Sequence, residues 1–182
     1  MKGRWVFVGV AVLALLAGAA LWELDGAPVA RTAVPQFSPE ELYGAAFRDV
    51  EGKPQSLGPY RKQILVLNFW APWCGPCREE MPGFSRLQAH WAPRGVQFVG
   101  ITGDGADEVQ RFVREVPTAY PLMLGGKEAD SWARRLGDVD GVLPYTVILG
   151  PEGRVITQKV GVYSEPDLQK TLKTLRLQSA GK

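Results

Sequence analysis

Two cysteines dominate the chemistry that this sequence can perform. Cys74 and Cys77 are the only cysteines among 182 residues, and Gly75 and Pro76 separate them. An apolar run, residues 64–70, ends just before them, which predicts a junction between a strand and a helix. Two thiols at this spacing can close to a disulfide within one helical turn. The pattern therefore predicts a dithiol that alternates between reduced and oxidised forms.

The two thiols are expected to differ in reactivity. Cys74 would lie at the first turn of the helix, where unpaired N–H groups and the helix dipole favour its thiolate. Cys77 would lie one turn further along, shielded and protonated. Pro76 suits the first turn, and Gly75 lets a partner chain approach the sulfur closely. We therefore expect Cys74 to be an exposed nucleophile and Cys77 to resolve the intermediate.

A metal site and a static disulfide are the alternatives. Zinc needs four ligands, but the chain has no further cysteine, and His90 is its only histidine. A static disulfide that closes so short a loop would stabilise the fold little. We therefore predict neither a metal nor a cofactor.

The composition is that of an ordinary globular protein with a sizeable core, with 46% hydrophobic and 22% charged residues. The net charge is +2, from 21 basic and 19 acidic residues, and no block of like charge stands out. Nucleic-acid binding therefore has no electrostatic support.

The first 22 residues differ from the rest. Lys2 and Arg4 precede an unbroken apolar stretch, residues 5–22, which as a helix would span roughly 27 Å, close to the thickness of a bilayer core. The basic residues place the amino terminus inside and the remainder outside. A cleaved signal peptide, with residues 17–19 as its small-residue site, is the alternative. We expect an uncleaved membrane anchor and, in either case, a domain outside the cytosol, where disulfides persist.

A linker at residues 23–35, with glycine, two prolines and no apolar periodicity, would join this anchor to a domain at 36–178, followed by a tail at 179–182.

Apolar runs bounded by turns predict strands, and apolar residues at helical spacing predict helices. The expected strands are 64–70, 96–102, 120–124, 145–149 and 155–160, after a short hairpin of 46–50 with 55–57. The expected helices are 75–91, about 107–116, 128–136 and one capped by Ser164. This order predicts an α/β fold with a mixed sheet and helices on both faces.

Residues 69–77, Phe-Trp-Ala-Pro-Trp-Cys-Gly-Pro-Cys, resemble the active site of thioredoxin. Thioredoxin-like folds also carry a cis-proline beside the cysteines, just before a buried strand, and Pro144 in the segment 143–149 matches that position. Within this fold the chain resembles the TlpA/ResA-like family of membrane-anchored, extracytoplasmic thiol-disulfide oxidoreductases. The resemblance rests on the anchor, the hairpin, an insertion at about 103–136 and the segment 77–82, Cys-Arg-Glu-Glu-Met-Pro.

The resemblance implies a role for Glu80. In that family a glutamate three residues after the second cysteine lies near the dithiol, and Asn68 replaces the buried aspartate of thioredoxin proper. A partly desolvated Glu80 would have a raised pKa and could move protons to and from Cys77. The alternative is that Glu80 is a solvated helix residue like Glu79.

The implied activity is protein-disulfide reduction through a mixed disulfide on Cys74. Leu143, beside Pro144, would pair with the substrate backbone, and Trp73 would form an exposed apolar lip. The Gly-Pro pair between the cysteines resembles that of reducing thioredoxins, whose reduction potential is about −270 mV, rather than that of strong oxidants, whose potential is about −120 mV.

The resemblance also implies a bacterial inner-membrane protein that faces the periplasm, and an electron donor of the DsbD or CcdA type.

Two other functions remain open. One is a cytochrome c maturation factor of the CcmG-like branch, which binds and reduces apocytochrome c, although Tyr145 stands where that branch has an acid. The other is a thiol peroxidase of the related peroxiredoxin superfamily. Its Pro-x-x-x-Thr-x-x-Cys motif is missing before Cys74.

Overall fold

The computed structural model describes residues 36–180. The expected anchor at 1–22 and the linker at 23–35 lie outside the described residues. Within 36–180, no helix combines the length and apolar character needed to cross a membrane. The last helix ends at Ala180, so the first two residues of the expected tail are helical.

A seven-stranded mixed sheet forms the centre of the fold, in the order β2-β1-β5-β4-β3-β6-β7. Strand β3 is parallel to β4 and antiparallel to β6, so the mixed sheet predicted from sequence is confirmed. Its strands are β1 (Phe47–Arg48), β2 (Pro54–Gln55), β3 (Ile64–Phe69), β4 (Val96–Thr102), β5 (Leu122–Leu124), β6 (Tyr145–Leu149) and β7 (Val155–Val160).

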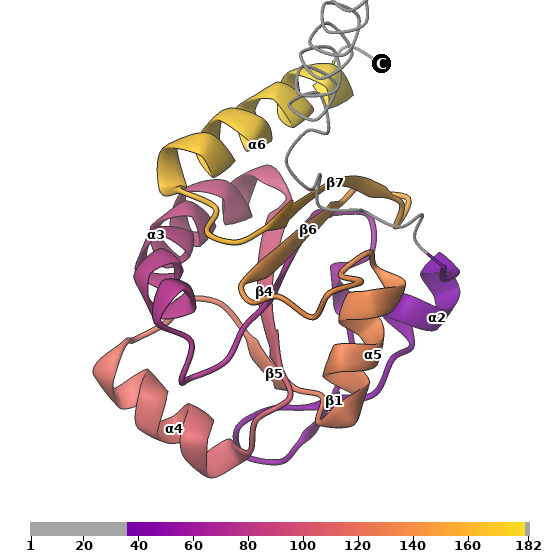
Figure 1. Cartoon of the computed structure of the whole chain (residues 1–182). Coiled ribbons are helices and arrows are strands. Elements are labelled where there is room, and N and C mark those ends of the chain that lie inside the picture. Colours follow the sequence, from indigo (N-terminus) through magenta and orange to yellow (C-terminus); the bar gives the residue numbers. More distant parts are fainter. Residues whose placement is uncertain (1–35, 181–182) are drawn as a thin grey trace, which may run out of the picture. The chain divides into compact units, whose positions relative to one another are not determined.

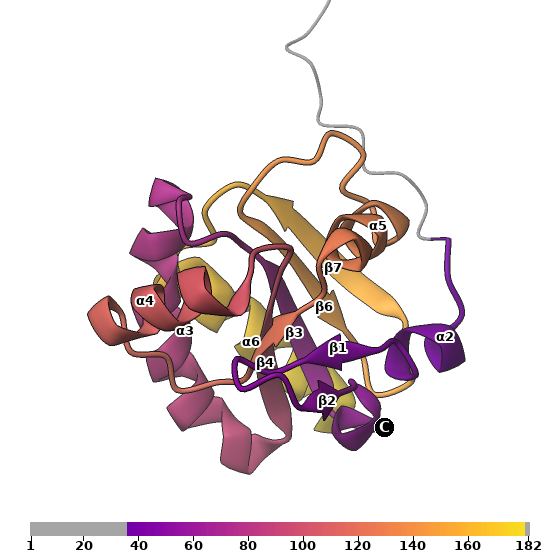
Figure 2. The ribbon, with the colours of Figure 1, turned by 90° about the horizontal axis from the view of Figure 1, so that it is seen from below.

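The three central strands are buried almost throughout, which explains their nearly continuous apolar sequence. Figures 1 and 2 show that helices cover both faces of the sheet, as expected. One face carries α3 (Gly75–Trp91), α4 (Ala106–Glu115) and α6 (Glu165–Ala180), and the other carries α2 (Pro39–Tyr43) and α5 (Lys127–Arg135). Each helix buries an apolar stripe against the sheet, and the sheet separates two apolar clusters.

Three helix starts differ from the sequence predictions, and one of them, that of α5, lies one residue before the expected start at about 128. Helix α2 was not expected, although Ser38 and Glu41 form a reciprocal capping box at its start and Pro39 follows the cap. Its five residues are too few to show an apolar period. Helix α4 begins one residue before Asp107, and its N-cap is Gly105, which has no side chain to act as a cap. The acidic first turn of α4 interacts favourably with the helix dipole instead.

The elements that position the cysteines match their predicted bounds closely. Strand β3 ends at Phe69, and α3 covers Gly75–Trp91 as predicted. The connection between them therefore brings both cysteines to the carboxyl end of the central strands.

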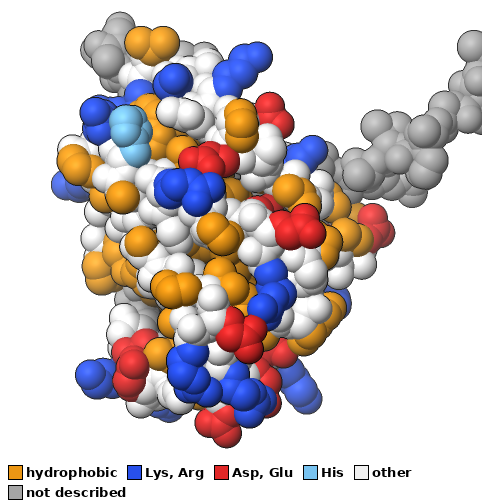
Figure 3. All heavy atoms as spheres, turned by 90° about the vertical axis from the view of Figure 1, so that its left-hand side faces the viewer, with side chains coloured by type: hydrophobic (Ala, Val, Ile, Leu, Met, Phe, Trp, Pro, Cys, Tyr) orange, Lys and Arg blue, Asp and Glu red, His pale blue; other side chains and the backbone are white. Residues whose placement is uncertain are grey.

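Figure 3 shows the side of the molecule that carries α3 and α4, where Lys, Arg, Asp and Glu side chains are interspersed around apolar atoms.

Candidate active site

The dithiol lies at the amino-terminal end of α3. Cys74 is the N-cap of the helix, and its Sγ accepts a hydrogen bond from the Cys77 N–H at 3.2 Å. Cys74 and Cys77 form a disulfide in this structure, with Cα atoms 5.3 Å apart. When the disulfide is reduced, the same N–H and the helix dipole would stabilise a Cys74 thiolate. The structure thus places the two sulfurs in contact, as the spacing predicted.

The exposure of Cys74 differs from the prediction. Cys74 is only 5% exposed and packs with Cys77 in the apolar cluster on the α3 side of the sheet. The preceding residue, Trp73, is the exposed one at 74%, as expected for an apolar lip. The start of a helix often lies at the surface, whereas the start of this helix packs in the apolar cluster against the sheet. A substrate must therefore reach a recessed sulfur.

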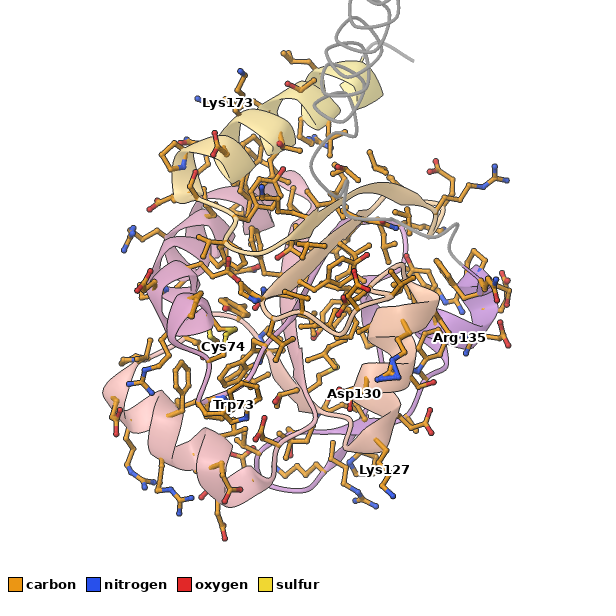
Figure 4. All side chains as sticks on the ribbon, viewed as in Figure 1. Trp73, Cys74, Lys127, Asp130, Arg135 and Lys173 are labelled. Atoms are coloured by element: carbon orange, nitrogen blue, oxygen red, sulfur yellow. A yellow bond between two sulfur atoms is a disulfide. The ribbon has the colours of Figure 1, made fainter. Side chains whose placement is uncertain are left out.

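A groove begins beside the dithiol and runs toward α5, with a volume of about 380 Å³. Trp73 and Leu143 line the end near the disulfide. Lys127 and Asp130 line the α5 side, and Figure 4 shows them across from Trp73 and Cys74. Two further exposed apolar residues, Val139 and Val142, belong to the loop whose Asp138, Gly141 and Leu143 line the groove.

Glu80 is buried beneath the same helix end, with 5% of its surface exposed. Its Oε1 accepts a hydrogen bond from Asn68 Nδ2, and its Oε2 accepts one from the Tyr163 N–H, both at 2.8 Å. Burial raises the pKa of Glu80 to about 7, and the two hydrogen bonds lower it only in part. Glu80 is therefore not a solvated residue like Glu79, which is exposed.

The expected cis-proline is present directly before β6. The Leu143–Pro144 peptide bond is cis, and the Pro144 carbonyl accepts a hydrogen bond from the Gly161 N–H at 2.8 Å. Among residues 36–180, the main-chain N–H and C=O of Leu143 make no hydrogen bond. These two groups are therefore available to an extended peptide.

Arg78 is a site residue that sequence reasoning missed. Its guanidinium contacts the Pro72 carbonyl at 3.4 Å and forms an ion pair with Glu115 at 2.7 Å. It also lies over the Phe112 ring, 5.2 Å from the ring centroid. These contacts connect the loop before Cys74 to α4. No sequence signal links Arg78 to Glu115, because the pairing depends on how the two helices pack.

Tyr163 is a second residue that the sequence did not reveal. It supplies a main-chain N–H to Glu80 from the loop between β7 and α6. Any residue except proline has such a group, so nothing in the side-chain pattern marks it. The other predicted site residues, Gly75 and Pro76, form the first turn of α3 and are exposed.

The fold and this site define a thioredoxin-like protein with a redox disulfide at the start of a helix. The model of the AhpC/TSA family matches residues 22–158, and the chain belongs to this family. The thiol-disulfide oxidoreductase ResA of Bacillus thuringiensis (strain Al Hakam) is 27% identical, with 96% of this chain and 99% of that protein covered. ResA of Bacillus subtilis (strain 168) is 30% identical over 64% of each chain.

Solved structures agree with this assignment. A thiol:disulfide interchange protein of the thioredoxin family from Chlorobium tepidum superposes with a TM-score of 0.63 at 28% identity, covering 82% of this chain and 99% of that one. A thioredoxin-related protein from Neisseria meningitidis serogroup B gives 0.62 at 32% identity, covering 72% and 98%. The thioredoxin-like fold and the TlpA/ResA-like resemblance are confirmed, and the chain is a thiol-disulfide oxidoreductase.

Proposed function

We propose that this protein reduces disulfides in other proteins outside the cytosol, and that Cys74 and Cys77 cycle between dithiol and disulfide. One observation carries the proposal: Cys74 caps α3 in a disulfide with Cys77, between an exposed tryptophan and a buried glutamate. The combination supplies a stabilised thiolate, a contact surface and a group for moving a proton.

The reaction proceeds in two exchanges. The Cys74 thiolate attacks one sulfur of the substrate disulfide, which forms a mixed disulfide and releases the other substrate sulfur as a thiolate. Cys77 then loses its proton and attacks Cys74 Sγ. This closes the Cys74–Cys77 disulfide and releases the second substrate thiolate. Two electrons pass from the protein to the substrate, and the released thiolates take up protons.

Glu80 is proposed to accept the proton that Cys77 loses. It follows Cys77 by three residues on α3, so the two side chains lie on the same face of the helix. A carboxyl group with a pKa of about 7 exists in both forms at neutral pH, which suits a proton acceptor. Asn68, where thioredoxin proper has an acid, cannot take this role because an amide does not titrate.

Protein substrates are proposed to bind across the apolar surface around the dithiol. Trp73 would pack on the substrate, and the main chain of Leu143 would pair with an extended strand. Val139 and Val142 would extend the apolar contact along the groove. An extended segment fits this arrangement because one strand can use the free main-chain groups and the exposed side chains together.

The site of action and the partners are part of the proposal. The apolar segment 5–22 supports a single-pass anchor in the bacterial inner membrane, with the domain on the periplasmic side. A membrane electron donor of the DsbD or CcdA type would return electrons to the dithiol. Apocytochrome c is a candidate substrate, because its haem attachment requires reduced cysteines.

The first test is the reduction potential of the Cys74–Cys77 pair, measured by equilibration with defined dithiol buffers. We expect a value near or below that of thioredoxin, about −270 mV. A value near the strong oxidants, about −120 mV, would contradict the proposal and make the protein a disulfide donor.

Peroxide consumption separates this proposal from the thiol peroxidase alternative. Leu67 and Ala71 stand at the positions where the motif of a peroxidatic cysteine has proline and threonine. We therefore expect the reduced protein to consume almost no hydrogen peroxide under conditions in which it reduces insulin. Rapid peroxide turnover with slow insulin reduction would reverse the assignment.

A further inference from the structure

Asn68 contacts Glu80 and has an unusual hydrogen-bond arrangement. It lies in β3, is 1% exposed, and its Nδ2 donates both to Glu80 Oε1 at 2.8 Å and to Thr146 Oγ1 at 3.2 Å. Its Oδ1 is fully buried and accepts no hydrogen bond from the described residues. A buried acceptor without a donor is costly, so it calls for an explanation.

The two forms of Glu80 need opposite partners. The charged carboxylate accepts hydrogen bonds, and both of its neighbours, Asn68 Nδ2 and the Tyr163 N–H, are donors. The protonated carboxyl carries an O–H and needs an acceptor. The Tyr163 N–H is fixed in the main chain. The amide of Asn68 can turn about its last side-chain bond, which exchanges the places of Nδ2 and Oδ1.

The other titratable groups around Glu80 do not offer this choice. Cys77, on the same helix, carries no proton in the disulfide form. Burial raises the pKa of Tyr120, which stays neutral and makes no hydrogen bond within the described part of the chain. The Tyr163 hydroxyl is held by Thr171 Oγ1 at 2.6 Å. On α6, Glu165 pairs with Arg86 of α3 instead.

We propose that the Asn68 side-chain amide is a positioning group that turns with the protonation of Glu80, so that this carboxyl keeps a matched partner in both forms. With Glu80 charged, Nδ2 faces the carboxylate, as in this structure. With Glu80 protonated, Oδ1 occupies that place and accepts from the carboxyl O–H. The Thr146 hydroxyl, which can donate or accept, reorients and donates to the same Oδ1.

The inference rests on the proposed role of Glu80, because it describes how that residue could exchange protons while its carboxyl group keeps a hydrogen-bond partner in both forms. It adds a role for Asn68, which replaces the aspartate of thioredoxin proper, namely to give Glu80 a hydrogen-bond partner in each protonation state. An amide is suited to this task because it presents a donor and an acceptor from one planar group.

Nuclear magnetic resonance of the oxidised protein tests the proposal directly, since no turnover is required. The Glu80 carboxyl carbon and the Asn68 side-chain nitrogen would be followed from pH 5 to pH 9. We expect both signals to titrate with one midpoint, and the Asn68 amide protons to change their contacts from Thr146 and Glu80 to other neighbours below it. An Asn68 signal that stays constant while Glu80 titrates would overturn the proposal.

Variants sharpen the result. Asn68→Leu removes a donor to the charged form of Glu80 and an acceptor for its protonated form, so we expect the two losses to offset each other and the Glu80 midpoint to move by less than about half a pH unit. Thr146→Val is the matched control, because it removes the other hydrogen bond of Asn68 and leaves both contacts with Glu80 in place. A rise of about one unit or more in Asn68→Leu, which is the result for an amide that only donates to the charged form, would contradict the proposal.

If Asn68→Leu does not fold, Asn68→Asp keeps the shape of the side chain and replaces the amide with an acid. Two adjacent carboxyl groups would then share one proton and titrate in two separated steps. A single unshifted step would overturn the proposal. The proposed role of Glu80 fails by a different result, namely Glu80→Gln exchanging thiols as fast as the unmodified protein at every pH, and the proposed reductase function fails by a reduction potential near that of the strong oxidants.

Discussion

The two sides of the Cys74–Cys77 disulfide are built in opposite ways. On one side, Glu80 and Asn68 are buried, and elements from four separate parts of the chain meet around them. On the other side, Trp73 and the loop carrying Val139 and Val142 are exposed beside the groove. Proton transfer therefore depends on the folded core, whereas substrate contact depends on a few surface side chains. Changes on the buried side should therefore alter pH dependence and stability, and changes on the exposed side should alter only the use of large substrates.

The cysteines lie where the two sides meet, and their removal should have the largest effect. Cys74→Ser should reduce disulfide reduction by on the order of 10³-fold or more, because the attacking thiolate is lost and the remaining thiol, Cys77, is fully buried. Cys77→Ser should also stop turnover but should accumulate the mixed disulfide on Cys74. Gel electrophoresis without reducing agent, after incubation with a disulfide-containing protein, would show the trapped species. Equal trapping by both variants would contradict the assigned order of attack.

On the buried side, Glu80→Gln should slow thiol exchange near neutral pH by on the order of 10²-fold. It should also remove the rise in rate that accompanies ionisation of Glu80 near pH 7. Stopped-flow measurement of insulin reduction from pH 5 to pH 9 would check this, with Glu79→Gln as the matched control, since Glu79 is exposed on the same helix. An identical loss in both variants would point to a general effect of charge.

The same group should make stability depend on pH. Burial raises the pKa of Glu80 from 4.5 to about 7, so between these values the folded protein holds a proton that the unfolded chain has lost. The contribution of Glu80 therefore lowers the free energy of unfolding as pH rises through that window, by roughly 3 kcal/mol in all. Urea titrations at pH 4.5 and pH 8 should show this loss in the unmodified protein and a smaller one in Glu80→Gln. An equal loss in both would exclude Glu80 as its source.

On the exposed side, Trp73→Ala should separate large substrates from small ones. We expect the KM for a disulfide-containing protein to rise by about tenfold, because an exposed aromatic contact is lost. Reduction of a small disulfide reagent should change by less than about twofold, and the free energy of unfolding by less than about 0.5 kcal/mol. An equally large decrease in the rate of reduction of the small reagent would show that Trp73 affects the reactivity of the dithiol itself.

Arg78 should have the smallest effect, since its ion pair with Glu115 is largely exposed. Arg78→Ala should lower the free energy of unfolding by less than about 1 kcal/mol, yet change the reaction rate of Cys74 with iodoacetamide by a few fold, because its contact with the Pro72 carbonyl is lost. Arg86→Ala removes a comparable ion pair with Glu165 but no contact with the loop before Cys74. It should therefore leave the rate of the reaction with iodoacetamide unchanged. Equal rates in the two variants would show that Arg78 does not position the loop.

The sequence predicted the strands and the helix that position the dithiol, because these elements are strongly apolar and have clear ends. Strand β4 and helix α3 have their expected bounds. Glu80 was identified through the resemblance to the TlpA/ResA-like family, in which a glutamate follows the second cysteine by three residues. The contact between Glu80 and the Tyr163 N–H could not be predicted, since it joins residues 83 apart through a main-chain group. The burial of Cys74 was missed for a related reason, because it depends on packing against the sheet rather than on local pattern.

The recessed position of Cys74 bears on when this protein can act during the life of its substrate. Because only 5% of Cys74 is exposed, we expect a substrate disulfide to reach its sulfur by bending past Trp73 and lying along Leu143. A disulfide held rigidly inside a finished domain cannot do so, whereas one on a loose or newly exported segment can. We therefore expect selection by the conformational freedom of the substrate, which would direct reduction to chains that have not yet completed folding and spare the disulfides of mature proteins in the same compartment.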